Sequence, residues 1–310
     1  MRIAIVAGGR TPERDVSLRG GHRIETALAS LGHDAWTVDP AERKLVEALR
    51  ERSAELCWLA LHGKEGEDGT VQRLLDLERI PYTGTRALDC ELTFDKVLAK
   101  EVLHRANVPT PDWVVIEGSA LRDLGAGASL PTTIERVGLP CVVKPSRSGS
   151  ALGVAVVERA AELAGAVMAA LSYSDAAIVE RFVSGTEVAA AAVGQPLELL
   201  PLVEVAPKDG VYDYGARYTA GATDYWAPAR LEPDTATAAS NAAAQALDAL
   251  SIRSIGRADL IIDGSGQPWV LEANVSPGMT DTSLVPMAAA AAGLSLAQLC
   301  DRVILASSSP

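Results

Sequence analysis

The chain has 310 residues, of which 48% are hydrophobic and 22% charged, and its formal net charge at pH 7 is −12. The acidic balance argues against a nucleic-acid or anionic-membrane partner, because both require a basic surface, and the length allows two or three hydrophobic cores. Four scattered cysteines without a CxxC pair, no signal peptide before the strand-like "RIAIVAGG", and no apolar run long enough to span a bilayer predict a cytoplasmic, multi-domain α/β protein.

The first third of the chain alternates predicted strands and helices. Short apolar runs are followed by amphipathic stretches, and Gly32 can terminate the first helix. This rhythm is typical of an open parallel sheet with helices on both faces. The predicted elements are strand 3–6, helix 17–31, strand 35–39, helix 42–51, strand 56–61 and helix 70–77.

Two further domains are expected, with boundaries at 1–92, 93–183 and 184–310. The middle domain opens with the helix "FDKVLAKEVLHRA", and residues 118–131 are expected to form a linker-like excursion within it. Its other predicted elements are strands 113–116, 141–146 and 153–157 and helix 160–171. The last domain is expected to contain strand 187–193, an apolar stretch 197–205, helix 237–250, a β-hairpin and a terminal helix.

The hairpin is predicted from "GRADLIIDGSGQPWVLEANVSPGM", residues 256–279. Symmetric folding about its turn puts Asp259 opposite Glu272 and Arg257 opposite Asn274. Like charges across a strand pair destabilise it unless a hard cation lies between them, and Mg²⁺ prefers such oxygen ligands. Alternatively, Asp259 pairs with Arg257 or Arg253 in a solvated patch. The residues expected on the opposite, apolar face are Leu260, Ile262 and Leu271.

A candidate phosphate-binding loop follows the strand that ends in Lys144. In "VVKPSRSGSALG" small residues dominate, so that backbone N–H groups and serine hydroxyls can surround an anion. The spacing is not that of a Walker loop, and a flexible surface loop is the alternative. Lys96 is a second candidate phosphate contact, although a lysine on an amphipathic helix is commonly solvated.

Four more residues are weaker candidates when each is taken alone. Glu180 and Glu187 flank a loop beside an apolar segment, which suits an adenine amine and ribose hydroxyls. Glu13 and the segment "ALHGKEGEDG", which contains His62, resemble polar loops around a small substrate. A GxGxxG fingerprint is absent, which excludes a Rossmann dehydrogenase.

Taken together, these segments resemble the D-alanine–D-alanine ligase family of the ATP-grasp superfamily. The motifs that carry the resemblance follow the family's order over essentially the whole chain. They are "ERDVSL", "ALHGKEGEDG", "PYTG", "FDK", "VVKPSRSGS", "YDYGARY", "GRADL" and "LEANVSPGMTDTSLVPMA". The resemblance implies a three-domain ATP-grasp architecture: an N-terminal open parallel sheet, then central and C-terminal domains that bind nucleotide between them.

The resemblance also implies roles for the hairpin and the nucleotide residues. Glu272 would bridge two Mg²⁺ ions, for which Mn²⁺ can substitute, with Asp259 on one ion and Asn274 on the other. The implied ATP contacts are Lys96 and Lys144 on the phosphates, Glu180 near the adenine and Glu187 on the ribose.

For the amino-acid substrates, the resemblance implies that Glu13 receives the ammonium group of the first D-alanine and is linked to Ser150 and Tyr218. Arg257 and the backbone N–H of Gly278 would stabilise the developing oxyanion. The remaining implied contacts are His62 near the first D-alanine, Ser283 on the carboxylate of the second, and Arg217 on the γ-phosphate.

The implied reaction needs no enzyme nucleophile, because phosphoryl transfer from ATP turns a D-alanine carboxylate into an acylphosphate that the second amine attacks. The motif "YDYGARY", which is expected to act as a lid, departs from the family pattern at two positions. Arg217 stands where the family usually has lysine, and Gly215 stands where a larger residue is common. A ligase of the same mechanism with another acceptor, serving secondary metabolism or self-resistance, is the nearest alternative. The second alternative is a protein of the same fold that binds ATP without catalysing a reaction. A homodimer through the N-terminal domain is expected.

Overall fold

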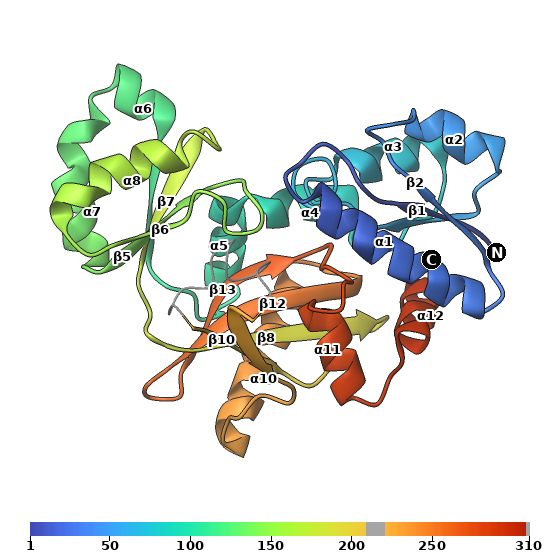
Figure 1. The fold of residues 1–310 in the computed structure, drawn as a ribbon. Helices are drawn as coiled ribbons and strands as arrows, with labels where there is room; N and C mark the ends of the chain where they lie inside the picture. Colours follow the sequence, from blue (N-terminus) through green and yellow to red (C-terminus); the bar gives the residue numbers. More distant parts are fainter. Residues whose placement is uncertain (209–220, 308–310) are drawn as a thin grey trace.

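The computed structural model describes residues 1–208 and 221–307, and its chain builds three β-sheets in succession (Figure 1). The first is parallel, in the order β2-β1-β3. Alternate residues of β1 serve two cores: Ile3 and Ile5 pack toward α1, whereas Ala4 and Val6 face α2 and α3. The predicted open parallel sheet with helices on both faces is confirmed. Its elements are β1 (Arg2–Val6), α1 (Arg14–Ser30), β2 (Asp34–Val38), α2 (Leu45–Glu51), β3 (Leu56–Leu59) and α3 (Thr70–Glu78).

Two helices lead from this sheet to the next. The predicted helix at 94–106 corresponds to α5 (Lys96–Arg105), but α4 (Ala87–Phe94), which precedes it, was not expected. Asp95 separates them and caps α5, because its carboxylate accepts the N–H groups of Val97 and Leu98. The cap fixes the start of α5, so that Lys96 is its first residue.

The second sheet is antiparallel, in the order β4-β7-β5-β6, with α7 and α8 packed on one face. Residues 118–131 are largely helical, so the expected linker is wrong. Leu121 and Leu130 of this segment pack against the core, which gives it an apolar side. The elements are β4 (Trp113–Glu117), α6 (Gly118–Asp123), η1 (Ala126–Ser129), α7 (Leu130–Val137), β5 (Cys141–Pro145), β6 (Ala155–Val157), η2 (Ala160–Glu162), α8 (Leu163–Ala170) and β7 (Ala176–Arg181).

The third sheet runs β11-β10-β8-β12-β13, with β9 paired to β8. The alanine run of β8 is buried on both faces: Ala189 and Ala191 face α11 and α12, whereas Ala190 and Ala192 face α10. One terminal helix was expected, but two are present, and β11 was not predicted. The elements are β8 (Gly185–Gly194), β9 (Glu198–Leu199), β10 (Val203–Pro207), β11 (Thr223–Trp226), α10 (Pro233–Ala249), β12 (Ser254–Asp263), β13 (Pro268–Asn274), α11 (Leu284–Ala291) and α12 (Leu296–Ser307).

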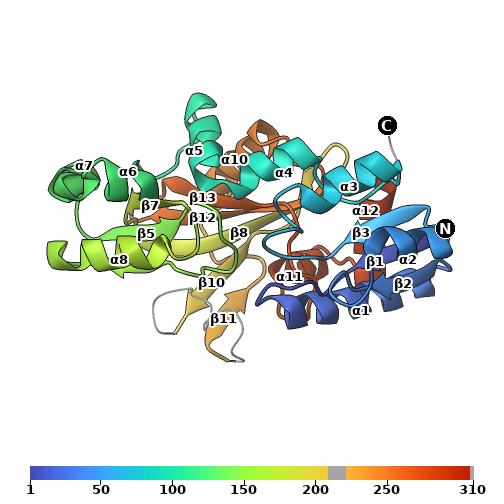
Figure 2. The same ribbon diagram turned by 90° about the horizontal axis from the view of Figure 1, so that it is seen from above.

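The last helices join the third sheet to the first. Leu299 and Val303 of α12 share a core with Ile24 and Leu28 of α1, and the two helices lie side by side in both views (Figures 1 and 2). In the described ranges no single helix is long and apolar enough to cross a membrane; α11 and α12 meet that requirement only as a pair, which is bent by 105°. The domain boundaries after residues 92 and 183 stay a prediction.

Candidate active site

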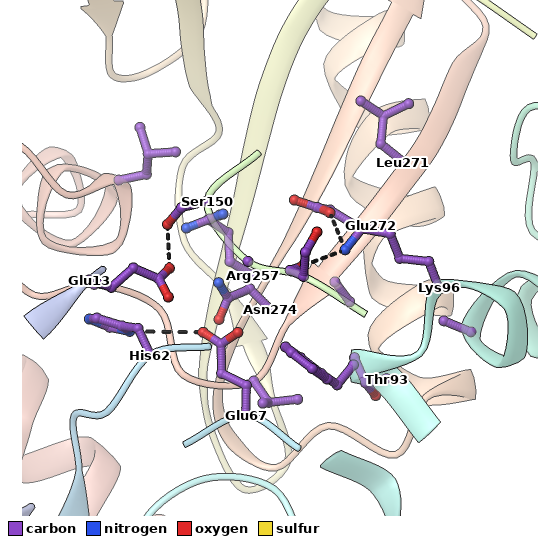
Figure 3. Close-up of a pocket in the computed structure, with 18 of the residues that line it drawn as sticks. Glu13, His62, Glu67, Thr93, Lys96, Ser150, Arg257, Leu271, Glu272 and Asn274 are labelled. Atoms are coloured by element: carbon purple, nitrogen blue, oxygen red, sulfur yellow. Dashed lines mark hydrogen bonds and ion pairs between the residues drawn. The ribbon is translucent and has the colours of Figure 1, made fainter. Parts of the chain in front are cut away.

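The hairpin β12–β13 has the predicted register, with Asp259 opposite Glu272 and Arg257 opposite Asn274. A β-bulge interrupts it after Asp259, because the next pair is Leu260 with Val270. Leu271 is the extra residue of the bulge, and it lines the site beside Glu272 (Figure 3). The expectation that Leu271 belongs to the apolar face is therefore wrong, and Val270 occupies the core instead.

Asp259 and Glu272 each have a cationic neighbour. Arg257 donates to Asp259 through Nε and Nη2 at 2.6 and 2.7 Å, and both side chains are buried. Lys96 Nζ lies 3.5 Å from a carboxylate oxygen of Glu272, whose side chain keeps 31% of its surface exposed. The alternative pairing of Asp259 with Arg257 thus occurs, but in a buried position and not in a solvated patch.

The donor set of the hairpin is chemically suited to Mg²⁺. In the part of the chain that the structure describes, no group of three or more His, Cys, Asp or Glu is arranged to hold a metal ion. The hairpin offers two carboxylates and the amide of Asn274, whose Oδ1 accepts the N–H of Ser276 at 2.8 Å and retains a second lone pair. Such a set fits an ion that takes one or two protein carboxylates and completes its shell with water and phosphate oxygens.

A second group of charges lies across the cleft, on the central sheet. Lys144 on β5 and Glu180 on β7 are diagonal neighbours on one face, because Val142 pairs with Glu180 and Lys144 with Ile178. The Lys144 ammonium contacts one oxygen of Glu180, and Lys100 Nζ lies 3.2 Å from the other. We refer to Lys100, Glu180 and Lys144 as the lysine–glutamate cluster.

Burial and pairing shift the pKa values within the lysine–glutamate cluster. Burial raises the pKa of Glu180, but the charges of Lys144 and Lys100 outweigh it, so the net shift is downward. Burial also lowers the pKa of Lys144, and the charges of Glu180, Glu272 and Glu187 reverse this to a net rise. For Lys100 burial dominates, and its pKa is lowered.

Two cavities meet at Lys96 and Glu272. The larger one encloses about 450 Å³ between the second and third sheets, within the range of small-molecule sites; the smaller one lies toward the N-terminal sheet. Every predicted site residue that the structure describes lines one of them. The larger cavity has Lys144, Glu180, Glu187 and Asp259, the smaller has Glu13, His62, Ser150, Arg257, Asn274, Gly278 and Ser283, and Lys96 and Glu272 line both. Tyr218, Arg217 and Gly215 lie outside the described residues.

Glu13 connects the N-terminal sheet to the loop after β5. It is buried directly before α1, and the Ser150 hydroxyl donates a hydrogen bond to its carboxylate (Figure 3). Two glycines make room for this carboxylate: a Cβ on Gly63 would lie 2.5 Å from Glu13 Oε2, and one on Gly149 would lie 3.0 Å from Oε1. The predicted link between Glu13 and Ser150 is therefore present as a contact.

His62 is a buried residue that follows the strand β3. Its Nδ1 lies 3.0 Å from the Ser276 carbonyl oxygen and 3.8 Å from Glu67 Oε1. Burial lowers the pKa of His62, but the nearby carboxylates of Glu67 and Glu13 give a net rise. Glu67 was not singled out as a site residue, although it lies in the segment "ALHGKEGEDG"; the spacing of five from His62 carries no regular period that would indicate a contact.

Gly278 and Ser283 form a tight turn before α11. Ser283 Oγ accepts the N–H of Thr280 at 3.0 Å, and a Cβ on Gly278 would lie 2.8 Å from that oxygen. The turn therefore leaves no room for a side chain at Gly278. The backbone of Gly278 borders the smaller cavity. Lys100 and Leu271 are two further lining residues that were not predicted as site residues, the first because a helical lysine is ordinarily solvated and the second because it was expected on the apolar face of the hairpin.

The parallel sheet and the two antiparallel sheets that enclose the larger cavity are arranged as in solved D-alanine–D-alanine ligases, which have the ATP-grasp fold. The family model described as "D-ala D-ala ligase C-terminus" matches residues 102–305. The chain is 39% identical over 305 residues to a D-alanine–D-alanine ligase of Moorella thermoacetica, with 98% of both chains covered. It therefore belongs to the D-alanine–D-alanine ligase family.

Solved structures agree with this assignment. The D-alanine–D-alanine ligase of Bacillus anthracis complexed with ATP has a TM-score of 0.83 and 27% identity, with coverage of 99% of this chain and 97% of that chain. The VanG D-Ala:D-Ser ligase of Enterococcus faecalis has a TM-score of 0.85 and 26% identity, with coverage of 98% of both chains.

Proposed function

We propose that the protein is an ATP-dependent ligase that joins two D-alanines to form D-alanyl-D-alanine for peptidoglycan synthesis. The observation that carries this proposal is the meeting of the two cavities at Lys96 and Glu272. A nucleotide in the larger cavity would direct its terminal phosphate toward an amino acid in the smaller one. Family membership supports the same reaction.

In the first half-reaction a carboxylate oxygen of the first D-alanine attacks the γ-phosphorus of ATP, and ADP leaves. Lys96 and Lys144 bind and orient the phosphates, while Glu13 holds the ammonium group of the amino acid. The carboxylate becomes an acylphosphate, whose phosphate group leaves readily. Because positioning and charge neutralisation suffice for this transfer, the residues of the cleft need not supply a nucleophile.

In the second half-reaction the amine of the second D-alanine attacks the acyl carbon, an oxyanion develops, and phosphate leaves. Arg257 and the backbone N–H of Gly278 stabilise that oxyanion, and Ser283 binds the carboxylate of the second D-alanine. His62 lies near the first amino acid. The proposed ribose contact is Glu187. Tyr218 and Arg217 keep their implied roles as contacts of Glu13 and of the γ-phosphate.

Asp259, Glu272 and Asn274 would hold two Mg²⁺ ions, which supply neutralising charge for the phosphates when they are bound. The oxygen chemistry of the three side chains supports this assignment. We further propose that the enzyme acts in the cytoplasm as a homodimer. The four cysteines are free and buried, which fits a reducing compartment.

A substrate panel tests the proposal. Purified protein with ATP and Mg²⁺ is expected to release phosphate with D-alanine alone, and mass spectrometry should detect the dipeptide. L-alanine is the matched negative control. D-serine and D-lactate test the alternative acceptor, which is worth including because the chain resembles a D-Ala:D-Ser ligase. No turnover with D-alanine alone would refute D-alanine–D-alanine ligation.

A further inference from the structure

Lys100 is a buried cation that the proposed mechanism does not use; it lines the smaller cavity, and its ion-pair partner Glu180 lines the larger one. Its side chain is almost completely enclosed. Its ammonium donates to Thr110 Oγ1 at 2.7 Å and to the Pro111 carbonyl oxygen at 3.0 Å, and it lies 3.2 Å from Glu180 Oε2. The first two contacts are hydrogen bonds and the third is an ion pair, because Glu180 Oε2 has no hydrogen-bond partner among the described residues. The Trp113 ring covers the same group at 5.1 Å.

The second feature is the charge ratio of the lysine–glutamate cluster. Glu180 is 2% exposed and contacts both Lys144 and Lys100. With Lys144 as its sole partner, the carboxylate would cancel the charge of that lysine. With Lys100 on its other oxygen, the cluster carries one excess positive charge. Lys144 and Glu180 both line the larger cavity, so this excess adjoins the place where a phosphate would be bound.

The third feature is the helix that carries Lys100. Lys96 and Lys100 are four residues apart on α5 and therefore lie on the same side of the helix. The contacts of Lys100 with Thr110 and Pro111 hold this side of α5 against the start of the central sheet. At the beginning of the helix, Lys96 donates through its backbone N–H to the Ser146 carbonyl oxygen at 2.9 Å and through Nζ to the Ser148 carbonyl oxygen at 2.7 Å.

We propose that Lys100 is a positioning residue for ATP: it shares Glu180 with Lys144 and anchors α5, so that both Lys144 and Lys96 present positive charge to the phosphates. This inference rests on the proposed function, because it assumes that the larger cavity takes ATP. It assigns Glu180 to the two lysines, in place of a side-chain contact with adenine.

Binding of ADP and of adenosine to the full-length protein separates these two roles of Glu180. We expect Lys100→Met to weaken ADP binding by about tenfold, since hydrogen bonds to charged groups contribute on this scale. Adenosine, which lacks phosphates, should bind to the variant as it does to the wild type. In steady-state assays the KM for ATP should rise and the KM for D-alanine should not. Lys44→Met removes an exposed lysine far from the cleft and controls for the change in net charge.

A double-mutant cycle tests whether Lys100 acts through Glu180. In a Glu180→Gln background Lys144 is no longer cancelled, so Lys100→Met should then reduce ADP affinity by a smaller factor, the part that comes from the anchoring of α5. If Lys100→Met fails to fold, Thr110→Val removes one acceptor of the ammonium and should weaken ADP binding by a smaller factor, again without affecting adenosine.

Three outcomes overturn the inference: unchanged ADP affinity in Lys100→Met, equal losses for ADP and adenosine, or the same loss with and without Glu180. Equal losses would indicate that Lys100 supports the whole pocket or that Glu180 contacts the base. Failure of the proposed function is distinguishable, because it would appear as a wild-type protein without D-alanine-dependent turnover, whereas failure of this inference leaves wild-type turnover and ADP binding intact.

Discussion

The two charged walls of the nucleotide cavity differ in how completely their charges are enclosed. On the central sheet, one carboxylate is shared by two lysines; Glu180 and Lys100 are buried, and only 11% of the Lys144 side chain is exposed. On the hairpin, two carboxylates face two cations; Asp259 is buried with Arg257, but Glu272 is partly exposed and lies 3.5 Å from Lys96. The first wall has two lysines for one buried carboxylate, whereas the second has one partly exposed carboxylate that can accept a new cation.

Glu272→Gln should have the largest effect, because it removes the carboxylate that can exchange its partner. We expect kcat to fall by about 10³-fold, the scale found when an electrostatic group at a reacting phosphate or oxyanion is removed. The fold should be retained, since Glu272 is not in the core. Steady-state assays with circular dichroism measure both. Glu198→Gln, at an exposed position of the same sheet, is the control for charge, and near-normal turnover of Glu272→Gln would contradict the bridging role.

Arg257→Met tests the enclosed pair of the hairpin and should mainly reduce stability. The substitution leaves Asp259 buried without its guanidinium partner, which typically costs about 3–5 kcal/mol. If Asp259 belongs to a metal site, Mg²⁺ should then restore part of the lost stability. Urea unfolding with and without Mg²⁺ measures this difference. The same response to Mg²⁺ in the wild type and the variant would argue against a metal ion at Asp259.

The hairpin illustrates what could be predicted from sequence and what could not. The period of two and the turn at Asp263 predicted that Asp259 lies opposite Glu272, and the structure has this pair, but between the turn and the bulge the register differs by one residue from symmetric folding. The bulge at Leu271 depends on backbone geometry that leaves no trace in composition. Residues 118–131 were predicted to be linker-like because of their glycines. They are largely helical, and Leu121 and Leu130 give this segment an apolar side.

The lysine–glutamate cluster illustrates the other limit. Lys144 and Glu180 were predicted as separate candidates, but their contact depends on which strands of the central sheet are neighbours. Lys100 lies on a helix whose pattern does not distinguish it from exposed lysines such as Lys44. Contacts between domains, including Ser150 with Glu13, were predicted from the family resemblance and not from any local pattern.

His62 provides a pH test on the smaller cavity. Its pKa in the folded state is raised above 6.5 by Glu67 and Glu13 against the effect of burial. Protonated His62 therefore stabilises the fold fully below about pH 6.5, and this contribution is lost as the pH rises through the folded-state pKa. Glu67→Gln should lower the His62 pKa, as measured by NMR titration. The loss of stability in this variant should be larger at pH 6 than at pH 9; a pH-independent loss would contradict the pairing.

Gly149→Ala should have the smallest effect, and it tests how closely the loop after β5 fits Glu13. The new Cβ would lie 3.0 Å from Glu13 Oε1, so the carboxylate must shift by a few tenths of an ångström, and its contact with Ser150 with it. A displacement of 1 Å can reduce the rate of an enzyme by about 10²-fold. Because the shift here is smaller, we expect the KM for D-alanine to rise only about threefold, with little change in the KM for ATP. Gly165→Ala is the matched control: it lies inside α8 with no atom near the added methyl group, and it should stabilise the protein by about 0.5–1 kcal/mol without changing either constant. A Gly149→Ala variant with wild-type affinity for D-alanine would mean that Glu13 and Ser150 do not need this fit to hold the ammonium group.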